Sequence, residues 1–116
     1  MTGTAIGNLL ADLPSPGPDE LFEAILHRPG LRIERIVSSG QATPLGEWYD
    51  QAWDEWVLLL AGSAGLLLEG EHLPRILVPG DHLLLPARCR HRVAWTDPAV
   101  QTVWLAVHFT ISEERP

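Results

Sequence analysis

From Leu31 onward the chain consists of short segments in which apolar and polar residues alternate, and this pattern limits the fold more than any other feature. The first segment, LRIERIVS, is followed by similar ones at about 45–50, 55–61, 64–69, 74–78, 82–85, 91–95 and 101–110. Turn-forming residues such as Gly, Pro, Asp and Ser separate them. Many short strands at this spacing predict an all-β antiparallel sandwich or barrel rather than a βαβ fold.

The first thirty residues follow a different pattern. The apolar stretch AIGNLLADLP predicts an N-terminal strand, and DELFEAILHR predicts a short helix over 19–27. Asp19 is a suitable cap for that helix, and Pro29–Gly30 would end it. The sequence therefore predicts three parts: an N-terminal strand and short helix in 1–30, a barrel in 31–111, and a loose tail in 112–116.

Composition and charge exclude several classes of function. With 116 residues the chain has one core, and no apolar run approaches the ~20 residues of a membrane span. The net charge of −7 disfavours binding to nucleic acid or to an anionic membrane. The start lacks the basic region of a secretory signal, and the single Cys89 cannot form an internal disulfide. We therefore expect a cytoplasmic protein whose partner is a small molecule.

Residues 80–91, GDHLLLPARCRH, place an apolar strand before a proline and then a histidine among three arginines. Pro86 would end the strand because it has no N–H to donate to the ladder. His91 would begin the next strand, with its ring pointing inward at the mouth of the barrel. Alternation along that strand predicts that Arg90 and Arg92 face the opposite side, whereas Arg88 in the loop could reach the mouth.

Two stretches resemble conserved motifs of a known family. From Glu55 the chain reads EWVLLLAG, and from Gly80 it reads GDHLLLPARCRH. They are similar to the second half of the cupin motif G-X5-H-X-H-X3-4-E-X6-G and to the motif G-X5-P-X-G-X2-H-X3-N, whose histidine is matched by His91. Arg88 replaces the glycine of the second motif, and Trp95 replaces its asparagine. The resemblance implies a cupin-type double-stranded β-helix, a jelly-roll barrel.

The same resemblance implies a divalent metal ion inside the barrel, such as iron, manganese, zinc or nickel. Cupins hold the ion with the two histidines and the glutamate of the first motif and the histidine of the second. Counting back from Glu55, the two histidine positions fall on Trp48 and Asp50, or on Tyr49 and Gln51 with the shorter spacer. Neither pair contains a histidine, so the residues allow a metal but do not require one.

The remaining candidate ligands are Glu55, His91 and one oxygen donor. Asp50 is the preferred third ligand, because a carboxylate binds a divalent ion more strongly than an amide does, and Gln51 is its alternative. His108, which alternates with Val107 and Phe109, is a further candidate nitrogen ligand. One imidazole with carboxylates would suit Fe(II), Mn(II) or Zn(II) and would leave positions open for substrate.

Three functions are compatible with these residues. The first is a divalent-metal-binding small cupin that acts on or binds a small organic molecule, with Glu55 and His91 as ligands or as acid and base. The second is a non-catalytic ligand-binding or sensing cupin that has lost its metal site, and the third is a structural oligomerisation domain. We also predict a homodimer, because the N-terminal segment is rich in Ile and Leu and single-domain cupins are commonly dimers.

Overall fold

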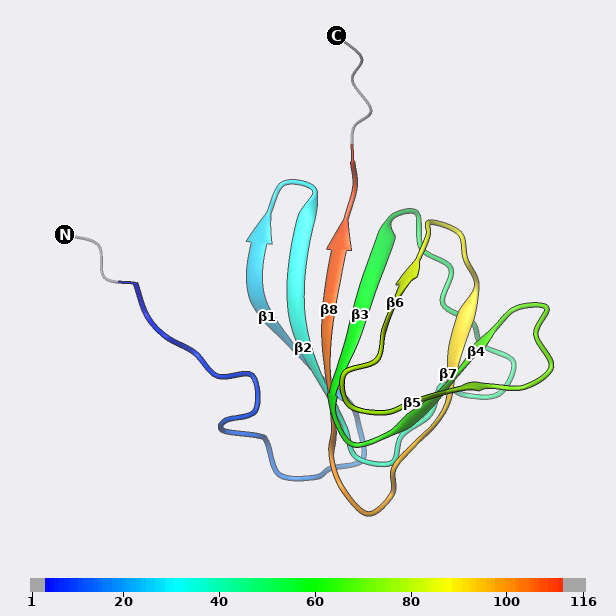
Figure 1. Ribbon diagram of the computed structural model, residues 1–116, viewed down its shortest axis with the longest axis horizontal. Helices are drawn as coiled ribbons and strands as arrows, with labels where there is room; N and C mark the ends of the chain where they lie inside the picture. The colour runs from blue at the N-terminus through cyan, green and yellow to red at the C-terminus, as the bar shows by residue number, and fades with distance from the viewer. Residues whose placement is uncertain (1–3, 112–116) are drawn as a thin grey trace, which may run out of the picture.

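The computed structural model describes residues 4–111, which form eight strands and no helix. They are β1 (Leu21–Arg28), β2 (Leu31–Ser38), β3 (Asp54–Ala61), β4 (Ala64–Leu68), β5 (Arg75–Leu77), β6 (His82–Leu85), β7 (His91–Thr96) and β8 (Thr102–Phe109). One sheet has the order β1-β2-β8-β3-β6 and the other β5-β4-β7, with antiparallel pairing throughout. The two sheets face each other (Figure 1), which confirms the predicted all-β jelly-roll barrel.

The short helix predicted over 19–27 is wrong, because most of this segment is β1. It pairs with β2, and Pro29–Gly30 is the two-residue turn of the hairpin, with a φ of 73° at Gly30. A bulge between Ala24 and Leu26 shifts the alternation by one residue and leaves the apolar residues at helix-like spacing. β1 is thus an edge strand of the barrel sheet. Within residues 4–111 no helix is long and apolar enough to cross a membrane.

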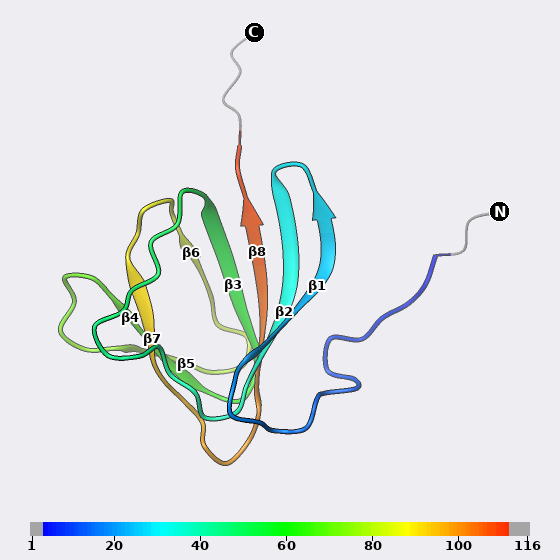
Figure 2. The same cartoon turned by 180° about the vertical axis from the view of Figure 1, so that it is seen from behind.

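A buried arginine, rather than strand pairing, holds the N-terminal segment. Residues 4–20 contain no strand, so the predicted N-terminal strand is absent. Arg35, on the outer face of β2, donates hydrogen bonds to the carbonyl oxygens of Leu9 (3.1 Å) and Ala11 (2.7 Å) and forms a salt bridge with Glu23 (2.8 Å). The segment therefore lies on the β1 side of the molecule, away from the three-stranded sheet (Figure 2). The predicted tail, 112–116, lies outside the described residues.

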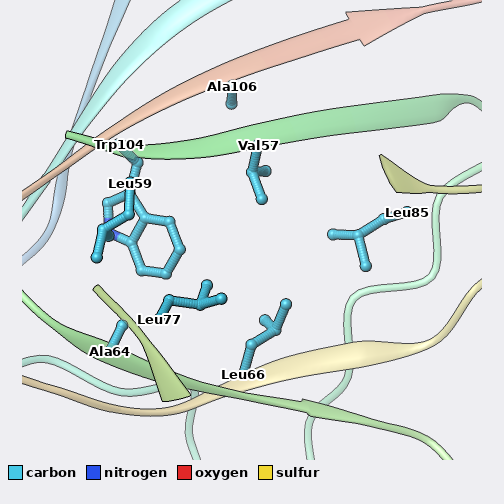
Figure 3. Close-up of a cluster of buried hydrophobic side chains, with 8 residues drawn as sticks. All are labelled: Val57, Leu59, Ala64, Leu66, Leu77, Leu85, Trp104 and Ala106. Carbon is cyan, nitrogen blue, oxygen red and sulfur yellow. The ribbon is translucent and has the colours of Figure 1, made fainter. Parts of the chain in front are cut away.

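The core fills the space between the two sheets. Figure 3 shows Val57 of β3 and Ala106 of β8 on the same side of the core, with Leu66 of the three-stranded sheet opposite. The buried apolar cluster consists of Val57, Leu59, Ala64, Leu66, Leu77, Leu85, Trp104 and Ala106. In β6 the side chains alternate as in a half-buried strand: Leu83 and Leu85 pack on the core while His82 and Leu84 are exposed.

Along the paired strands β3 and β8, the side chains that point into the barrel continue from the apolar core to the open end of the barrel. Leu59 lies opposite Trp104, Val57 opposite Ala106, and Glu55 opposite His108. Because side chains alternate along a strand, the same face that buries Val57 also buries Glu55. The barrel is therefore apolar at one end and carries ionisable groups toward the other.

We expect the protein to be a homodimer that uses the β1 edge. Ile6, Phe22 and Ile25 are exposed by 98%, 54% and 53%, and an uncovered edge strand with apolar side chains favours pairing with a second chain. Analytical ultracentrifugation at micromolar concentration should show a dimer, and Ile25→Lys should shift it toward monomer. Ile76→Lys, at an exposed position of the other sheet, is the matched control. A monomeric unaltered protein would contradict the expectation.

Candidate functional site

A cavity of about 260 Å³ lies inside the barrel and is lined by both sheets. Its polar lining consists of Glu20, Arg32, Glu34, Tyr49, Gln51, Glu55, His91 and His108. Its apolar lining consists of Phe22, Ile36, Val57, Leu66, Leu85, Val93 and Trp104. A mostly apolar hollow with a few converging polar groups is typical of a small-molecule site, and the volume here suits a small ligand.

His91 is held in one orientation by its neighbours. Its backbone exchanges two hydrogen bonds with Tyr49 (2.8 and 3.1 Å), and the two rings stack with centroids 5.4 Å apart. This bridge is all that remains of the strand predicted at 45–50. The ring Nδ1 lies 2.9 Å from the carbonyl oxygen of Cys89, so Nδ1 carries the proton and donates it. The Nε2 lone pair is therefore free, and Nε2 lies 3.8 Å from Oε1 of Glu55.

Glu55 is a buried carboxyl group, only 6% exposed. Burial raises its pKa to about 7, and the nearby Glu34 carboxylate adds to the rise, while a hydrogen bond from Gln51 and the charge of Arg32 oppose it. Burial also lowers the pKa of His91. Near neutral pH, Glu55 therefore exists in both protonation states beside a neutral imidazole, which is the condition for accepting and returning a proton.

His108 lies in the same wall, but its two nitrogens are already engaged. The indole Nε1–H of Trp53 donates to Nδ1 of His108 at 2.8 Å, and an indole can only donate. Nε2 of His108 must then carry the ring proton and donate it to Oε1 of Glu34 at 2.9 Å. The neutral ring offers no lone pair to the cavity. Burial lowers the pKa of His108, consistent with a ring that must accept from Trp53.

The structure brings four of the five predicted site residues to the cavity. Glu55, His91, Gln51 and His108 line it, but Asp50 does not. The carboxylate of Asp50 is directed to Arg88, 3.3 Å away, and is half-exposed. Tyr49 and Gln51 line the cavity on either side of it, so the alternation of side chains along the segment turns Asp50 outward.

The donor set does not fit a tightly held metal ion. His91 has the proton arrangement of a metal ligand, since its other nitrogen donates to a backbone carbonyl. Glu55 is beside it, but His108 presents an N–H rather than a lone pair. Among residues 4–111 no group of three or more His, Cys, Asp and Glu is arranged to hold an ion, whereas catalytic zinc sites use three protein ligands. Metal binding by Glu55 and His91 stays a prediction.

The three arginines around His91 lie outside the cavity. Arg88 is paired with Asp50 and has a φ of 65° at the position where the cupin motif has glycine. Arg90 pairs with Glu69, and Arg92 donates to the carbonyl oxygen of Thr43 at 2.8 Å. The guanidinium groups of Arg90 and Arg92 both lie within 6.0 Å of the Trp48 ring centroid. This cluster therefore holds the loops together on the outside of the barrel.

Sequence reasoning missed five cavity or supporting residues: Glu20, Arg32, Glu34, Tyr49 and Trp53. The alternation in LRIERIVS puts Arg32, Glu34 and Ile36 on one face, and that face turns out to line the cavity. The available signal was that Arg32 and Glu34 form a charged pair on one face of this strand, although the opposite face is also only partly apolar. Glu20 and Trp53 lie outside the strands and carry no comparable periodicity.

We expect Glu55→Gln to stabilise the protein at neutral and higher pH. A folded-state pKa near 7 against an unfolded value of 4.5 means that the folded form binds more protons between these values, so stability falls as pH rises from 4.5 to 7. The neutral amide avoids this loss, which amounts to about 3 kcal/mol. Urea unfolding should show the variant more stable at pH 8 and a shrinking difference toward pH 4.5. Glu71→Gln, on the surface, is the control, and a difference independent of pH would contradict the assignment.

Known structures resemble this chain along nearly its whole length, although no family model matches it and no curated protein does. A candidate mannose-6-phosphate isomerase of Ralstonia eutropha JMP134 is 56% identical, covers 93% of this chain and 100% of its own, and has a TM-score of 0.90. A cupin superfamily protein of Desulfitobacterium hafniense DCB-2 is 18% identical, with 92% and 93% covered and a TM-score of 0.73. The KdgF protein of a Halomonas species is 21% identical, with 95% and 96% covered and a TM-score of 0.69. The 56% identical relative shows that the chain belongs to the same family as that protein, and the likeness to the cupin structure shows that its double-stranded β-helix is the cupin fold.

Proposed function

We propose that the protein catalyses proton transfer on a small organic molecule bound in the barrel, in the manner of an isomerase. The observation that carries the proposal is the buried Glu55 carboxyl group, with a pKa of about 7, whose Oε1 lies 3.8 Å from the unprotonated Nε2 of His91. A general base works best when its pKa is near the working pH.

The chemistry needs only the residues that line the cavity. The ionised Glu55 carboxylate removes a proton from the carbon next to a substrate carbonyl, and the electron pair of that C–H bond forms a carbon–carbon double bond. In a substrate with a hydroxyl group on that carbon, the proton of the hydroxyl group passes to the former carbonyl oxygen and the O–H electron pair forms the new carbonyl bond. The protonated Glu55 then returns its proton to the former carbonyl carbon, where the electron pair of the carbon–carbon double bond takes it up. His91, with its Nε2 lone pair, can exchange the proton that passes between substrate oxygens, since histidine is the usual group for this role.

The 56% identical relative supports an isomerase, since its name assigns it isomerisation of a sugar phosphate. Fold likeness alone would not identify a reaction, because cupin-like barrels carry many activities. The alternative is a non-catalytic ligand-binding or sensing protein, in which the same cavity holds a ligand without turnover. Proton exchange into a bound ligand distinguishes the two.

We expect the unaltered protein to exchange the α-proton of a suitable carbonyl compound with solvent. Proton NMR in deuterium oxide, on a panel of small aldoses, ketoses and keto acids, measures the loss of that signal. Glu55→Gln should slow the exchange by a factor of about 10² to 10⁴, the usual contribution of a general base. The rate of the unaltered protein should rise with pH through about 7 as Glu55 ionises.

Two outcomes would contradict the proposal. Exchange that is equally fast in Glu55→Gln would remove Glu55 from the reaction. Ligand binding without exchange for any compound of the panel would favour the non-catalytic alternative. Glu71→Gln, at an exposed salt bridge with Arg75, should behave as the unaltered protein and shows that removing one surface carboxylate is harmless.

A divalent ion held by Glu55 and His91 is the second candidate, favoured by the free Nε2 lone pair of His91. Because only two ligands converge, we expect weak binding, with a Kd between about 10 μM and 1 mM. Calorimetric titration of chelator-treated protein with Fe(II), Mn(II), Zn(II) and Ni(II) checks this, and His91→Ala should abolish the heat. No binding tighter than about 1 mM would remove this candidate. Submicromolar binding that depends on His91 would make metal binding the primary function.

A further inference from the structure

We propose that the molecule held in this cavity is a small organic cation, such as an amine or a quaternary ammonium compound, with its charged group against Glu20. The inference rests on the proposed function only in using the same cavity, and it names the class of ligand rather than the reaction. It differs from what the name of the 56% identical relative implies, since that name specifies a phosphorylated sugar.

The charges that line the cavity are mostly negative. Three carboxyl groups, Glu20, Glu34 and Glu55, face it with one guanidinium group, Arg32. The net charge of these groups is therefore −2 with Glu55 ionised and −1 with Glu55 protonated. The single cation is close to one of these carboxylates, because Nε of Arg32 lies 3.6 Å from Oε2 of Glu34, an ion pair without a hydrogen bond, and its guanidinium group lies 5.8 Å from the Trp53 ring centroid. An anionic ligand would meet uncompensated negative charge.

Glu20 is the carboxylate that lacks a partner of opposite charge. Within residues 4–111 it forms no salt bridge, in contrast to Glu34, which is paired with the guanidinium group of Arg32. Its side chain is held in place by a buried chain of hydrogen bonds. The Trp104 indole donates to Oγ of Ser38 at 3.1 Å, and the Ser38 hydroxyl donates to Oε2 of Glu20. A fixed, unpaired carboxylate at the edge of an apolar cavity is suited to bind a cation.

Aromatic rings line the cavity that this carboxylate faces. Phe22, Tyr49 and Trp104 line the same cavity, and the faces of such rings attract ammonium groups. Burial raises the pKa of the Tyr49 hydroxyl most, and the charge of Glu20 is the next largest cause. The carboxylate of Glu20 therefore acts electrostatically on Tyr49. A carboxylate together with aromatic faces recognises an alkylammonium group both by charge and by contact area.

Matched probes test this inference directly. Choline and 3,3-dimethyl-1-butanol have nearly the same shape, but only choline is charged. Isothermal titration calorimetry should show choline binding at least about tenfold more tightly, a difference of about 1.4 kcal/mol. Mannose 6-phosphate, a dianionic probe, should bind more weakly than choline. Equal affinity for choline and the neutral alcohol, tighter binding of mannose 6-phosphate, or no choline binding at about 10 mM would each overturn the inference.

Two variants separate this inference from the proposed reaction. Glu20→Gln should remove most of the preference for choline while still accepting the Ser38 hydrogen bond, and circular dichroism checks that it folds. Glu71→Gln should retain the preference. Glu55→Gln should lose proton exchange yet still favour choline over the neutral alcohol. If no compound exchanges protons but the preference for choline depends on Glu20, the proposed reaction fails and the cation site stands. If Glu20→Gln leaves the preference for choline unchanged, the cation site is overturned.

Discussion

The antiparallel pairing of β3 with β8 is the contact on which the rest of the molecule depends. It places β8 between β2 and β3, at the centre of the five-stranded sheet, and it points Val57, Leu59, Trp104 and Ala106 at the opposite sheet. The same register continues to the pair Glu55 and His108, where the apolar core gives way to ionisable groups. One set of backbone hydrogen bonds thus fixes both the core and the site, so a slip of one residue would turn Glu55 outward.

Burying Glu55 at the end of an apolar barrel lowers the stability of the protein at neutral pH. The same burial raises the pKa of Glu55 into the range that proton transfer needs. A carboxylate removed from water without a full set of partners resists ionisation. The neighbours only partly compensate: Gln51 and Arg32 favour the charged form, whereas Glu34 opposes it. Around this group the side chains are held in place, His91 by Tyr49 and Cys89, and His108 by Trp53 and Glu34. Fixed orientation of this kind is what a proton-transfer site needs.

The barrel could be read from the sequence because period-2 alternation and turn residues are local signals. β1 was mistaken for a helix because the bulge between Ala24 and Leu26 breaks its alternation, and a bulge depends on pairing with another strand. The motif spacing led correctly to two cavity-lining side chains, Glu55 and His91. It favoured Asp50 over Gln51, whereas Gln51 and not Asp50 lines the cavity, because that choice depends on how the 47–51 segment joins β7 through the Tyr49 bridge. The tautomer of His108 likewise depends on Trp53, 55 positions away in the chain.

The central claim is that the interior of this barrel holds a carboxyl group poised between its two protonation states near neutral pH. A ¹³C NMR titration of the glutamate side-chain carboxyl signals, with the Glu55 signal identified by its absence in Glu55→Gln, measures that property in isolation. The account predicts a titration midpoint near pH 7 for Glu55. A midpoint near 4.5, the ordinary value for a solvated glutamate, would contradict it and would mean that the side chain is hydrated rather than enclosed by the barrel.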